Sequence, residues 1–247
     1  METVWQDLRL TTRKLTGYCL ISDRYDISVL ADKHPEDKTY QNKVQDLSKR
    51  YTGIRKVEGD GNCFYRALGF AYLESITGHK QEIKKFKDIA LHSKDELLSA
   101  GFEETSFCST FSNFLKAVSL VETENCTASL LNLFNDRCQS DSIVQYLRLL
   151  TSAYLKNQTE FFQYFLENGT SINTFCAQEV EPMNKECDHI QITALSEALR
   201  IPVQVEYMDT SDNVINHHTF PEGATPLVYL LYKSSHYEIL YVSDKGG

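Results

Sequence analysis

The sequence predicts an α+β (mixed α/β) fold in which a helical lobe packs on a mostly antiparallel C-terminal β-sheet. Two observations carry this prediction. Between residues 35 and 155 the apolar residues recur at helical spacing, whereas from residue 203 onward short β-rich segments alternate with turns. Helices that precede a run of strands are typical of the α+β class, in which helices cover one face of the sheet.

The first two thirds of the chain are expected to be helical. Residues 35–51 have the pattern of a helix with one polar face, and residues 63–77 carry apolar side chains four residues apart, which places them on one stripe of a helix. Helical spacing of apolar residues continues in four further segments, namely residues 82–91, 107–122, 128–136 and 142–155. These helices are expected to supply the face on which the sheet packs.

The pattern of the chain changes near residue 188. Asp188 and Gln191 have the spacing of a capping box, which predicts the start of a helix that Pro202 ends. The segments that follow are rich in β-branched and aromatic residues and are separated by turns. They predict two hairpins, formed by residues 203–208 with 214–220 and by residues 227–233 with 236–242.

The chain is long enough for one large domain. Its 247 residues are 42% hydrophobic, which allows a core that buries about three quarters of the unfolded surface. No internal repeat, low-complexity tract or linker rich in Pro, Gly or Ser divides the sequence. We therefore expect a single domain over residues 20–247, preceded by an N-terminal arm at residues 1–19.

Composition and charge limit the classes of function. The formal net charge of −9 disfavours a nucleic-acid-binding protein, because neutralising phosphate requires basic patches. No apolar run reaches the ~20 residues of a membrane span, and the first fifteen residues lack the apolar core of a signal peptide. The protein is therefore expected in the cytosol or nucleus. The seven cysteines include no C-x₂-C pair, which predicts free thiols and no metal site.

The chemistry-bearing residues begin at a glycine-rich turn. Residues 58–62, with the sequence EGDGN, lead directly into Cys63 and the predicted helix. The unpaired N–H groups and positive dipole end of a helix N-terminus stabilise an anion, which predicts a lowered pKa for the Cys63 thiol and a site for an oxyanion. The alternative is a buried structural cysteine that follows an ordinary helix cap made by Asp60 or Asn62.

A nucleophilic thiol requires a base, and His236 is favoured among the seven histidines. It opens the last predicted strand, and Glu238 follows two residues later, on the same face of that strand. Glu238 is therefore positioned to hold the imidazole by its second nitrogen, as in a catalytic triad. Elsewhere, His189 at a helix N-terminus is disfavoured in its protonated form, and His217 and His218 have no evident carboxylate partner.

Two motifs together carry a resemblance to a known family. The segments GDGNCFYRALG, at residues 59–69, and SSHYEILY, at residues 234–241, resemble the ovarian-tumour (OTU) family of ubiquitin-cleaving cysteine proteases, and within it the otubains. The likeness also includes residues 140–157 and 179–199 and covers the chain from about Leu20 to its end. It implies a papain-like OTU domain and leaves the N-terminal arm without a counterpart.

The resemblance implies roles for five residues. Cys63 is the nucleophile, and His236 is the general base and then the general acid. Asp60 matches the active-site aspartate of the family, whose segment forms the oxyanion hole with the N–H group of Cys63. The family has Asp or Asn at the position of Glu238, so the residue that orients the imidazole is left open between Glu238 and Glu186, an acidic position near the otubain active site.

The implied function is that of a deubiquitinating cysteine protease. It hydrolyses the bond between the C-terminal glycine of ubiquitin and a lysine of polyubiquitin or of a ubiquitinated protein, without a metal or an organic cofactor. The implied partners are ubiquitin chains, ubiquitinated proteins and ubiquitin-conjugating enzymes, and a monomer is expected. The alternative is a non-catalytic regulator that binds ubiquitin or ubiquitin-conjugating enzymes, which the intact pair of Cys63 and His236 disfavours.

Overall fold

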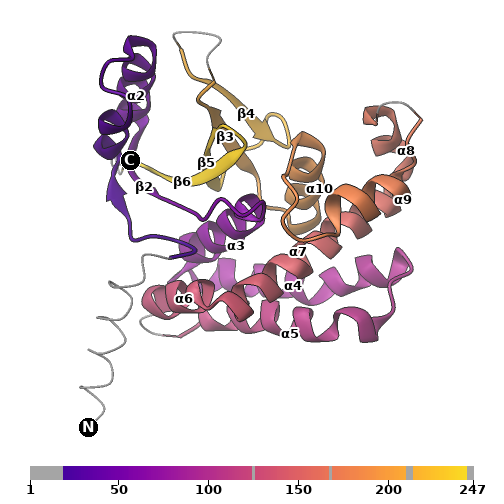
Figure 1. Ribbon diagram of the computed structural model, residues 1–247. Helices are drawn as coiled ribbons and strands as arrows, with labels where there is room; N and C mark the ends of the chain where they lie inside the picture. The colour runs from indigo at the N-terminus through magenta and orange to yellow at the C-terminus, as the bar shows by residue number, and fades with distance from the viewer. Residues whose placement is uncertain (1–18, 124–125, 167–168, 210–213, 244–247) are drawn as a thin grey trace.

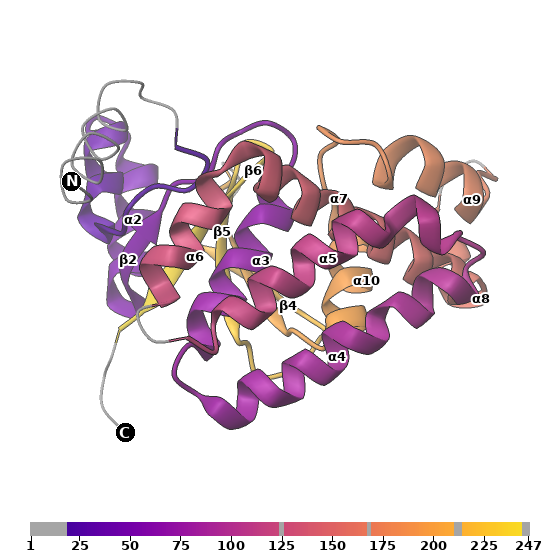
Figure 2. The same cartoon turned by 90° about the horizontal axis from the view of Figure 1, so that it is seen from below.

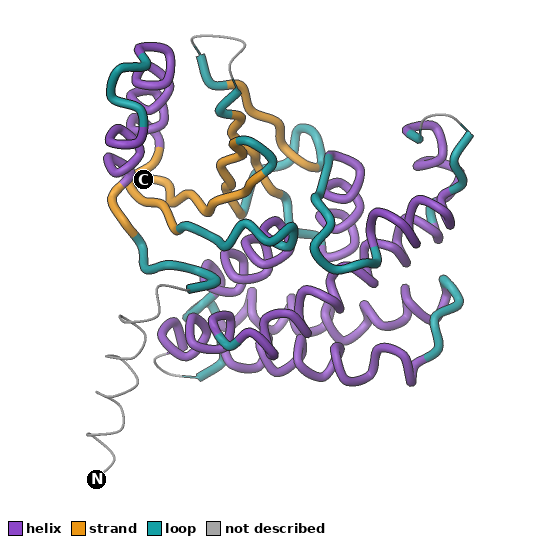
Figure 3. Tube along the Cα trace, in the orientation of Figure 1, coloured by secondary structure: helices purple, strands orange, loops and turns teal. Residues whose placement is uncertain are grey.

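The computed structural model describes residues 19–123, 126–166, 169–209 and 214–243. Its strands gather in one sheet beside a larger group of helices (Figures 1 and 3). The predicted α+β class with a mostly antiparallel sheet is confirmed. The expected N-terminal arm at residues 1–19 lies, except for Cys19, outside the described residues.

The sheet contains six strands in the order β1-β2-β6-β5-β3-β4. Neighbouring strands are antiparallel except β3 and β5, which run parallel. Both predicted hairpins are present, and Ser234 and Ser235 between β5 and β6 have the positive φ angles of a tight hairpin turn. The strands are β1 (Tyr25–Asp26), β2 (Tyr51–Arg55), β3 (Val203–Tyr207), β4 (Asn216–Phe220), β5 (Val228–Lys233) and β6 (His236–Val242).

The sheet is not confined to the C-terminal part of the chain, as the sequence pattern predicted. Strands β1 and β2 precede the helical lobe, and β2 pairs with β6 inside the sheet. Tyr51, expected at the end of a helix, is extended (φ −122°, ψ 142°) and begins β2. Its hydroxyl donates a hydrogen bond of 2.6 Å to the buried carboxylate of Glu206, 155 positions later in the sequence. This distant partner is not visible in the local pattern of residues 35–51.

Every helix predicted from an apolar pattern is present. Helix α10 begins with the predicted capping box of Asp188 and Gln191 and ends at Leu199, before Pro202. Within the described residues, no helix is long and apolar enough to cross a membrane. The longer helices are α2 (Lys38–Arg50), α3 (Cys63–Ile76), α4 (Lys80–Ser99), α5 (Glu104–Leu120), α6 (Cys126–Asn135), α7 (Arg137–Asn157) and α10 (His189–Leu199). The short ones are η1 (Ile27–Lys33), α8 (Thr159–Phe162), η2 (Gln163–Phe165), α9 (Ile172–Phe175) and η3 (Cys176–Val180).

Helices cover both faces of the sheet, whereas the sequence predicted one covered face. Leu230 and Ile239 belong to the large core that includes α3. Their neighbours Leu231 and Leu240 belong to a second core formed with η1 and α2. Because successive residues of a strand point to opposite faces, β5 and β6 are buried on both sides. The start of β6, with His236, is therefore held by a well-packed strand.

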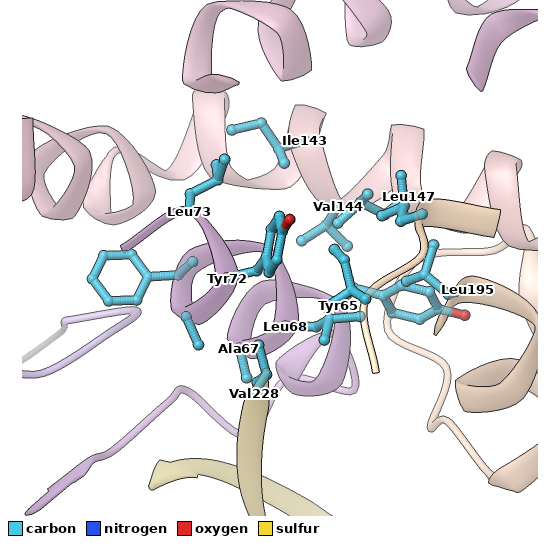
Figure 4. Close-up of a cluster of buried hydrophobic side chains, with 14 of the residues drawn as sticks. Tyr65, Ala67, Leu68, Tyr72, Leu73, Ile143, Val144, Leu147, Leu195 and Val228 are labelled. Carbon is cyan, nitrogen blue, oxygen red and sulfur yellow. The ribbon is translucent and has the colours of Figure 1, made fainter. Parts of the chain in front are cut away.

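Helix α3 is buried on all sides, not along the single stripe that its sequence suggested. Every residue from Cys63 to Leu73 is buried. Figure 2 shows α3 between the strands and the outer helices, and Figure 4 shows its side chains between Val144 and Leu147 of α7 and Val228 of β5. A helix enclosed in this way presents its first residue, Cys63, in a fixed position.

Candidate active site

The start of α3 and the start of β6 meet. Cys63 is the first residue of α3 and is 4% exposed. The backbone N–H groups of Phe64 and Tyr237 are near enough to its sulfur to lower the pKa of the thiol, and the rings of these two residues pack edge to face with centroids 5.5 Å apart. His236 immediately precedes Tyr237 in β6. The structure thus brings the two principal candidates of the sequence analysis, Cys63 and His236, to one place.

The imidazole of His236 lies over the glycine turn. A Cβ atom added to Gly59 would lie 3.5 Å from Nδ1 of His236. This Nδ1 atom is buried and has no hydrogen-bond partner within the described residues. Burial lowers the pKa of His236, and the nearby charge of Glu238 opposes this shift. A lowered pKa keeps the imidazole neutral near pH 7, which is the form that can accept a proton.

The predicted lowering of the Cys63 pKa is wrong for the substrate-free protein. Burial raises the pKa of the thiol, and the N–H groups of Tyr237 and Phe64 only partly offset that rise. The helix N-terminus does act in the expected direction, but desolvation of a nearly inaccessible sulfur outweighs it. The resting pair is therefore a neutral thiol beside a neutral imidazole.

The turn before Cys63 is held by close backbone packing. Gly61 has φ +77°, and a Cβ atom there would lie 2.5 Å from the backbone C and O atoms of Asn184. Asn62 is the N-cap residue of α3 but makes no side-chain cap hydrogen bond. Its Oδ1 instead accepts hydrogen bonds of 2.9 Å from Nη2 of Arg148 and from the backbone N–H of Asn184. The N–H groups at the start of α3 are thus not covered by the Asn62 side chain that the sequence offered as a cap.

Asp60 is an anion within the same turn. Its Oδ1 accepts the backbone N–H of Asn62 at 2.9 Å, and both carboxylate oxygens accept from the guanidinium of Arg66 at 3.0 Å. Burial acts to raise the pKa of Asp60, but the hydrogen bonds and charge of Arg66 outweigh it and hold that pKa below its usual value. Asp60 thus fixes the shape of the turn through Asn62 and Arg66, and it does not cap the helix.

The two candidate acids lie in different surroundings. Glu238 is buried, with Oε1 3.6 Å from Nζ of Lys33 in η1. Within the described residues, no hydrogen bond joins the imidazole of His236 to Glu238, although the strand pattern predicted one, and the charged partner of Glu238 is Lys33. Glu186 is exposed and forms no hydrogen bond or ion pair with other described residues.

The remaining histidines of the C-terminal half lie apart from this site. Nε2 of His189 is 2.8 Å from the hydroxyl of Tyr207, and the ring of His218 packs near that of His189. His217 and His218 lie in β4, which is separated from β6 by two strands of the sheet. Among the described residues, no group of three or more His, Cys, Asp or Glu side chains could hold a metal ion.

Comparison with known proteins identifies the family. The family model for Peptidase C65 Otubain matches residues 14–242. The chain belongs to the otubain family. The human ubiquitin thioesterase OTUB2 is 56% identical over 93% of this chain and 98% of its own length. The rat ubiquitin thioesterase OTUB1 is 48% identical over 90% of this chain and 83% of its own length.

A solved structure supports the same conclusion for the fold of this otubain. OTUB1 in a complex with ubiquitin aldehyde and UBC13~Ub superimposes with a TM-score of 0.84 at 27% identity, and the match covers 98% of each chain. The family and the fold that the two sequence motifs predicted are therefore confirmed.

Sequence reasoning about this otubain missed two charged residues near the site. Arg148 lies in α7 and is fully buried, although its contacts reach Gly61 and Asn62. A signal for it exists, because it interrupts the apolar stripe of α7 four residues after the buried Val144. Lys33 gives no such signal, since it lies in a short 3₁₀ helix that the sequence pattern does not predict.

Proposed function

We propose that this otubain is a cysteine-type deubiquitinase in which Cys63 is the nucleophile and His236 is the general base and acid. It hydrolyses the bond between the C-terminal glycine of ubiquitin and a lysine amine. One observation carries the assignment of residues: the backbone N–H group of Tyr237, the residue after His236, is near enough to the Cys63 sulfur to lower its pKa, so the start of β6 abuts the nucleophile. The enzyme class follows from membership of the otubain family.

The reaction uses the neutral pair as its starting state. The imidazole of His236 takes the thiol proton while the sulfur of Cys63 attacks the glycine carbonyl carbon, and the carbonyl oxygen becomes an oxyanion. Backbone N–H groups of the turn and of Cys63 are available to hydrogen-bond that oxyanion. The C–N bond then breaks, and the lysine amine leaves with the proton from His236. Water, deprotonated by His236, hydrolyses the thioester and releases the ubiquitin carboxylate and the free thiol.

We expect a ubiquitin that carries a C-terminal electrophile to label Cys63 and none of the other six cysteines. The ubiquitin tail delivers the electrophile to the site, whereas a small alkylating agent reaches exposed thiols such as Cys19, Cys108 and Cys138. Peptide mapping after labelling identifies the modified residue. Cys63→Ala is the control and should give no adduct with the ubiquitin probe. Labelling of the buried Cys187, or of the Cys63→Ala variant, would contradict the assignment.

Glu238 is the proposed acid that assists His236, although its carboxylate is paired with Lys33 in the substrate-free structure. Its charge favours the imidazolium form that arises during attack, so we expect Glu238→Ala to lower kcat/KM by about 10- to 100-fold, less than the ~10⁴-fold loss seen when a triad carboxylate is altered. Glu238→Gln keeps an acceptor oxygen and should recover part of the activity.

The matched control for Glu238 is Glu186→Ala. Glu186 is exposed and unpaired among the described residues, and we expect its loss to change kcat/KM by less than about twofold, which is within the usual effect of a surface substitution. A tenfold loss in Glu186→Ala together with an unaffected Glu238→Ala would transfer the supporting role to Glu186.

A second proposed property is binding to a ubiquitin-conjugating enzyme that carries ubiquitin. It is supported by the structural match to OTUB1 in complexes with UBC13~Ub and with UBCH5B~Ub. Hydrolysis and this binding can be separated by experiment. Cys63→Ala should abolish hydrolysis and leave the binding intact, as measured by co-elution of the conjugating enzyme that carries ubiquitin. The expectations of a monomer, and of no nucleic-acid or membrane partner, remain predictions from the sequence.

A further inference from the structure

Arg148 is a fully buried cation beneath the glycine turn. It donates from Nη2 to the carbonyl of Gly61 at 2.8 Å, to Oδ1 of Asn62 at 2.9 Å and to the carbonyl of Lys185 at 2.7 Å. Nη1 donates to the carbonyl of Val180 at 3.1 Å, and Nε donates to Oδ1 of Asn62 at 3.3 Å. The guanidinium thus joins two backbone segments, the turn before Cys63 and the segment that leads to α10.

The hydrogen bonds of Arg148 all go to neutral oxygens, which distinguishes it from the other buried arginines. Arg66 and Arg55 each contact a carboxylate, at 3.0 and 2.9 Å. Within the described residues, Arg148 forms no ion pair, and its guanidinium carbon lies 4.4 Å from the centre of the Tyr65 ring. A buried charge without a counterion destabilises a folded protein. We therefore expect this loss of stability to be offset by an advantage for the reaction at Cys63.

Arg148 contacts the two residues that precede the nucleophile, since it donates to the carbonyl of Gly61 and to Oδ1 of Asn62. Its positive charge interacts with Cys63, and burial, the larger effect, lowers its own pKa. Arg66, the other fully buried arginine near Cys63, is already neutralised by Asp60 and Asp141. Two thiols, Cys63 and Cys187, lie near the turn. The ionisable groups that act on them come from the turn, α3, α7 and the N-cap of α10, and they are Asp60, Tyr65, Arg66, Arg148 and Asp188.

We propose that Arg148 is a positioning residue for hydrolysis: it fixes the turn that presents the Cys63 N–H group, and its unpaired positive charge stabilises the thiolate and the oxyanion. This inference rests on the proposed function of the same site. It assigns two separable effects to one side chain. The fork of five donors holds the geometry, and the charge acts at a distance.

The test compares Arg148→Lys, Arg148→Gln and the matched control Arg55→Lys. Lysine keeps the charge but cannot span acceptors on two segments, whereas glutamine removes the charge. Arg55 is also buried and makes several side-chain hydrogen bonds, but to Tyr241, Ser22 and Glu74, away from the turn. Each variant is measured for Tm, for kcat/KM on a fluorogenic ubiquitin substrate, and for the pH midpoint of Cys63 alkylation by iodoacetamide, followed on the Cys63 peptide.

Both Arg148 variants are expected to lose at least about tenfold in kcat/KM, as for other losses of transition-state stabilisation. The alkylation midpoint should rise by about one pH unit in Arg148→Gln, the effect of losing a nearby charge at an effective dielectric constant of about 20, and should move less in Arg148→Lys. Arg55→Lys should lower Tm and leave the alkylation midpoint unchanged. A loss of stability that leaves the surroundings of Cys63 unchanged lowers Tm without moving this midpoint.

Two outcomes would overturn the inference. One is that Arg148→Lys folds and keeps kcat/KM within twofold of wild type, as does Arg148→Gln if that variant folds. The other is an alkylation midpoint that shifts as far in Arg55→Lys as in the Arg148 variants. Cys63→Ala in the same assay separates this failure from that of the proposed function. If Cys63→Ala is inactive while the Arg148 variants are active, only the role of Arg148 is wrong.

Discussion

Replacing His236 by alanine is expected to lower kcat/KM by about 10²- to 10⁴-fold, the usual contribution of a general base, while the protein stays folded. The imidazole Nδ1 makes no hydrogen bond within the described residues, so its removal costs the fold little. The backbone N–H groups of Phe64 and Tyr237, which act on the Cys63 thiol, are retained in this variant. The loss should therefore appear in the chemical step and not in Tm.

The pH profile provides a second readout for His236. The imidazole must be neutral to accept the thiol proton, and burial lowers its pKa from the usual 6.5. The acidic limb of the wild-type kcat/KM profile should therefore have its midpoint below 6.5, with activity rising as pH increases through it. In His236→Ala this limb should vanish, and the residual rate should increase toward alkaline pH, because the thiol of Cys63, whose pKa is raised, must then ionise unaided.

His92→Ala is the control for the loss of a histidine. His92 is exposed in α4, where its Nδ1 contacts the carbonyl of Asp88, and its replacement should change neither rate nor profile. If His236→Ala keeps more than about a tenth of the wild-type kcat/KM, the loss is smaller than a general base typically causes. The base would then be another group. His217 and His218, two strands away in β4, would then have to be tested in the same way.

Local patterns sufficed for the parts of the fold that are stabilised locally. The capping box of Asp188 and Gln191, the hairpin turn at Ser234 and Ser235, and the helix that starts at Cys63 all follow from residues within a few positions of one another. The motifs around Cys63 and His236 were also sufficient to identify the family. These features depend on hydrogen bonds and turns that neighbouring residues specify themselves.

Features that depend on distant residues could not be predicted from such patterns. The pairing of β2 with β6 joins segments that are far apart in the sequence. The parallel pairing of β3 with β5 joins strands whose local sequence does not specify which strands become neighbours. The direction of the Cys63 pKa shift depends on how deeply the sulfur is buried, which helix position does not specify. The same limit applies to Glu238, because its partner Lys33 lies about 200 positions earlier in the chain.

Gly61→Ala is expected to lower kcat/KM by about 10²- to 10³-fold, comparable with the loss of an oxyanion-hole donor. Alanine at φ +77° is strained, at a cost of roughly 1–2 kcal/mol. Its Cβ would also lie 2.5 Å from the backbone of Asn184, so the turn or the Asn184 segment must move. Either movement displaces the carbonyl of Gly61 from Arg148 and shifts the N–H group of Cys63, two residues further on.

Gly78→Ala separates these two effects. Gly78 has a similar φ of +81°, but a Cβ atom there would meet nothing within 4 Å. This variant should therefore show the backbone strain alone, as a lower Tm with kcat/KM close to wild type, since surface strain of roughly 1–2 kcal/mol lowers stability without moving the site. Gly61→Ala should show a similar or larger loss of Tm together with the fall in kcat/KM. The fall should lie mainly in kcat, because a displaced N–H group weakens stabilisation of the transition state more than it weakens binding of the ubiquitin substrate. Equal kcat/KM values in the two alanine variants would mean that the close approach of Gly61 to Asn184 does not hold the reacting geometry, and that the turn tolerates displacement during catalysis.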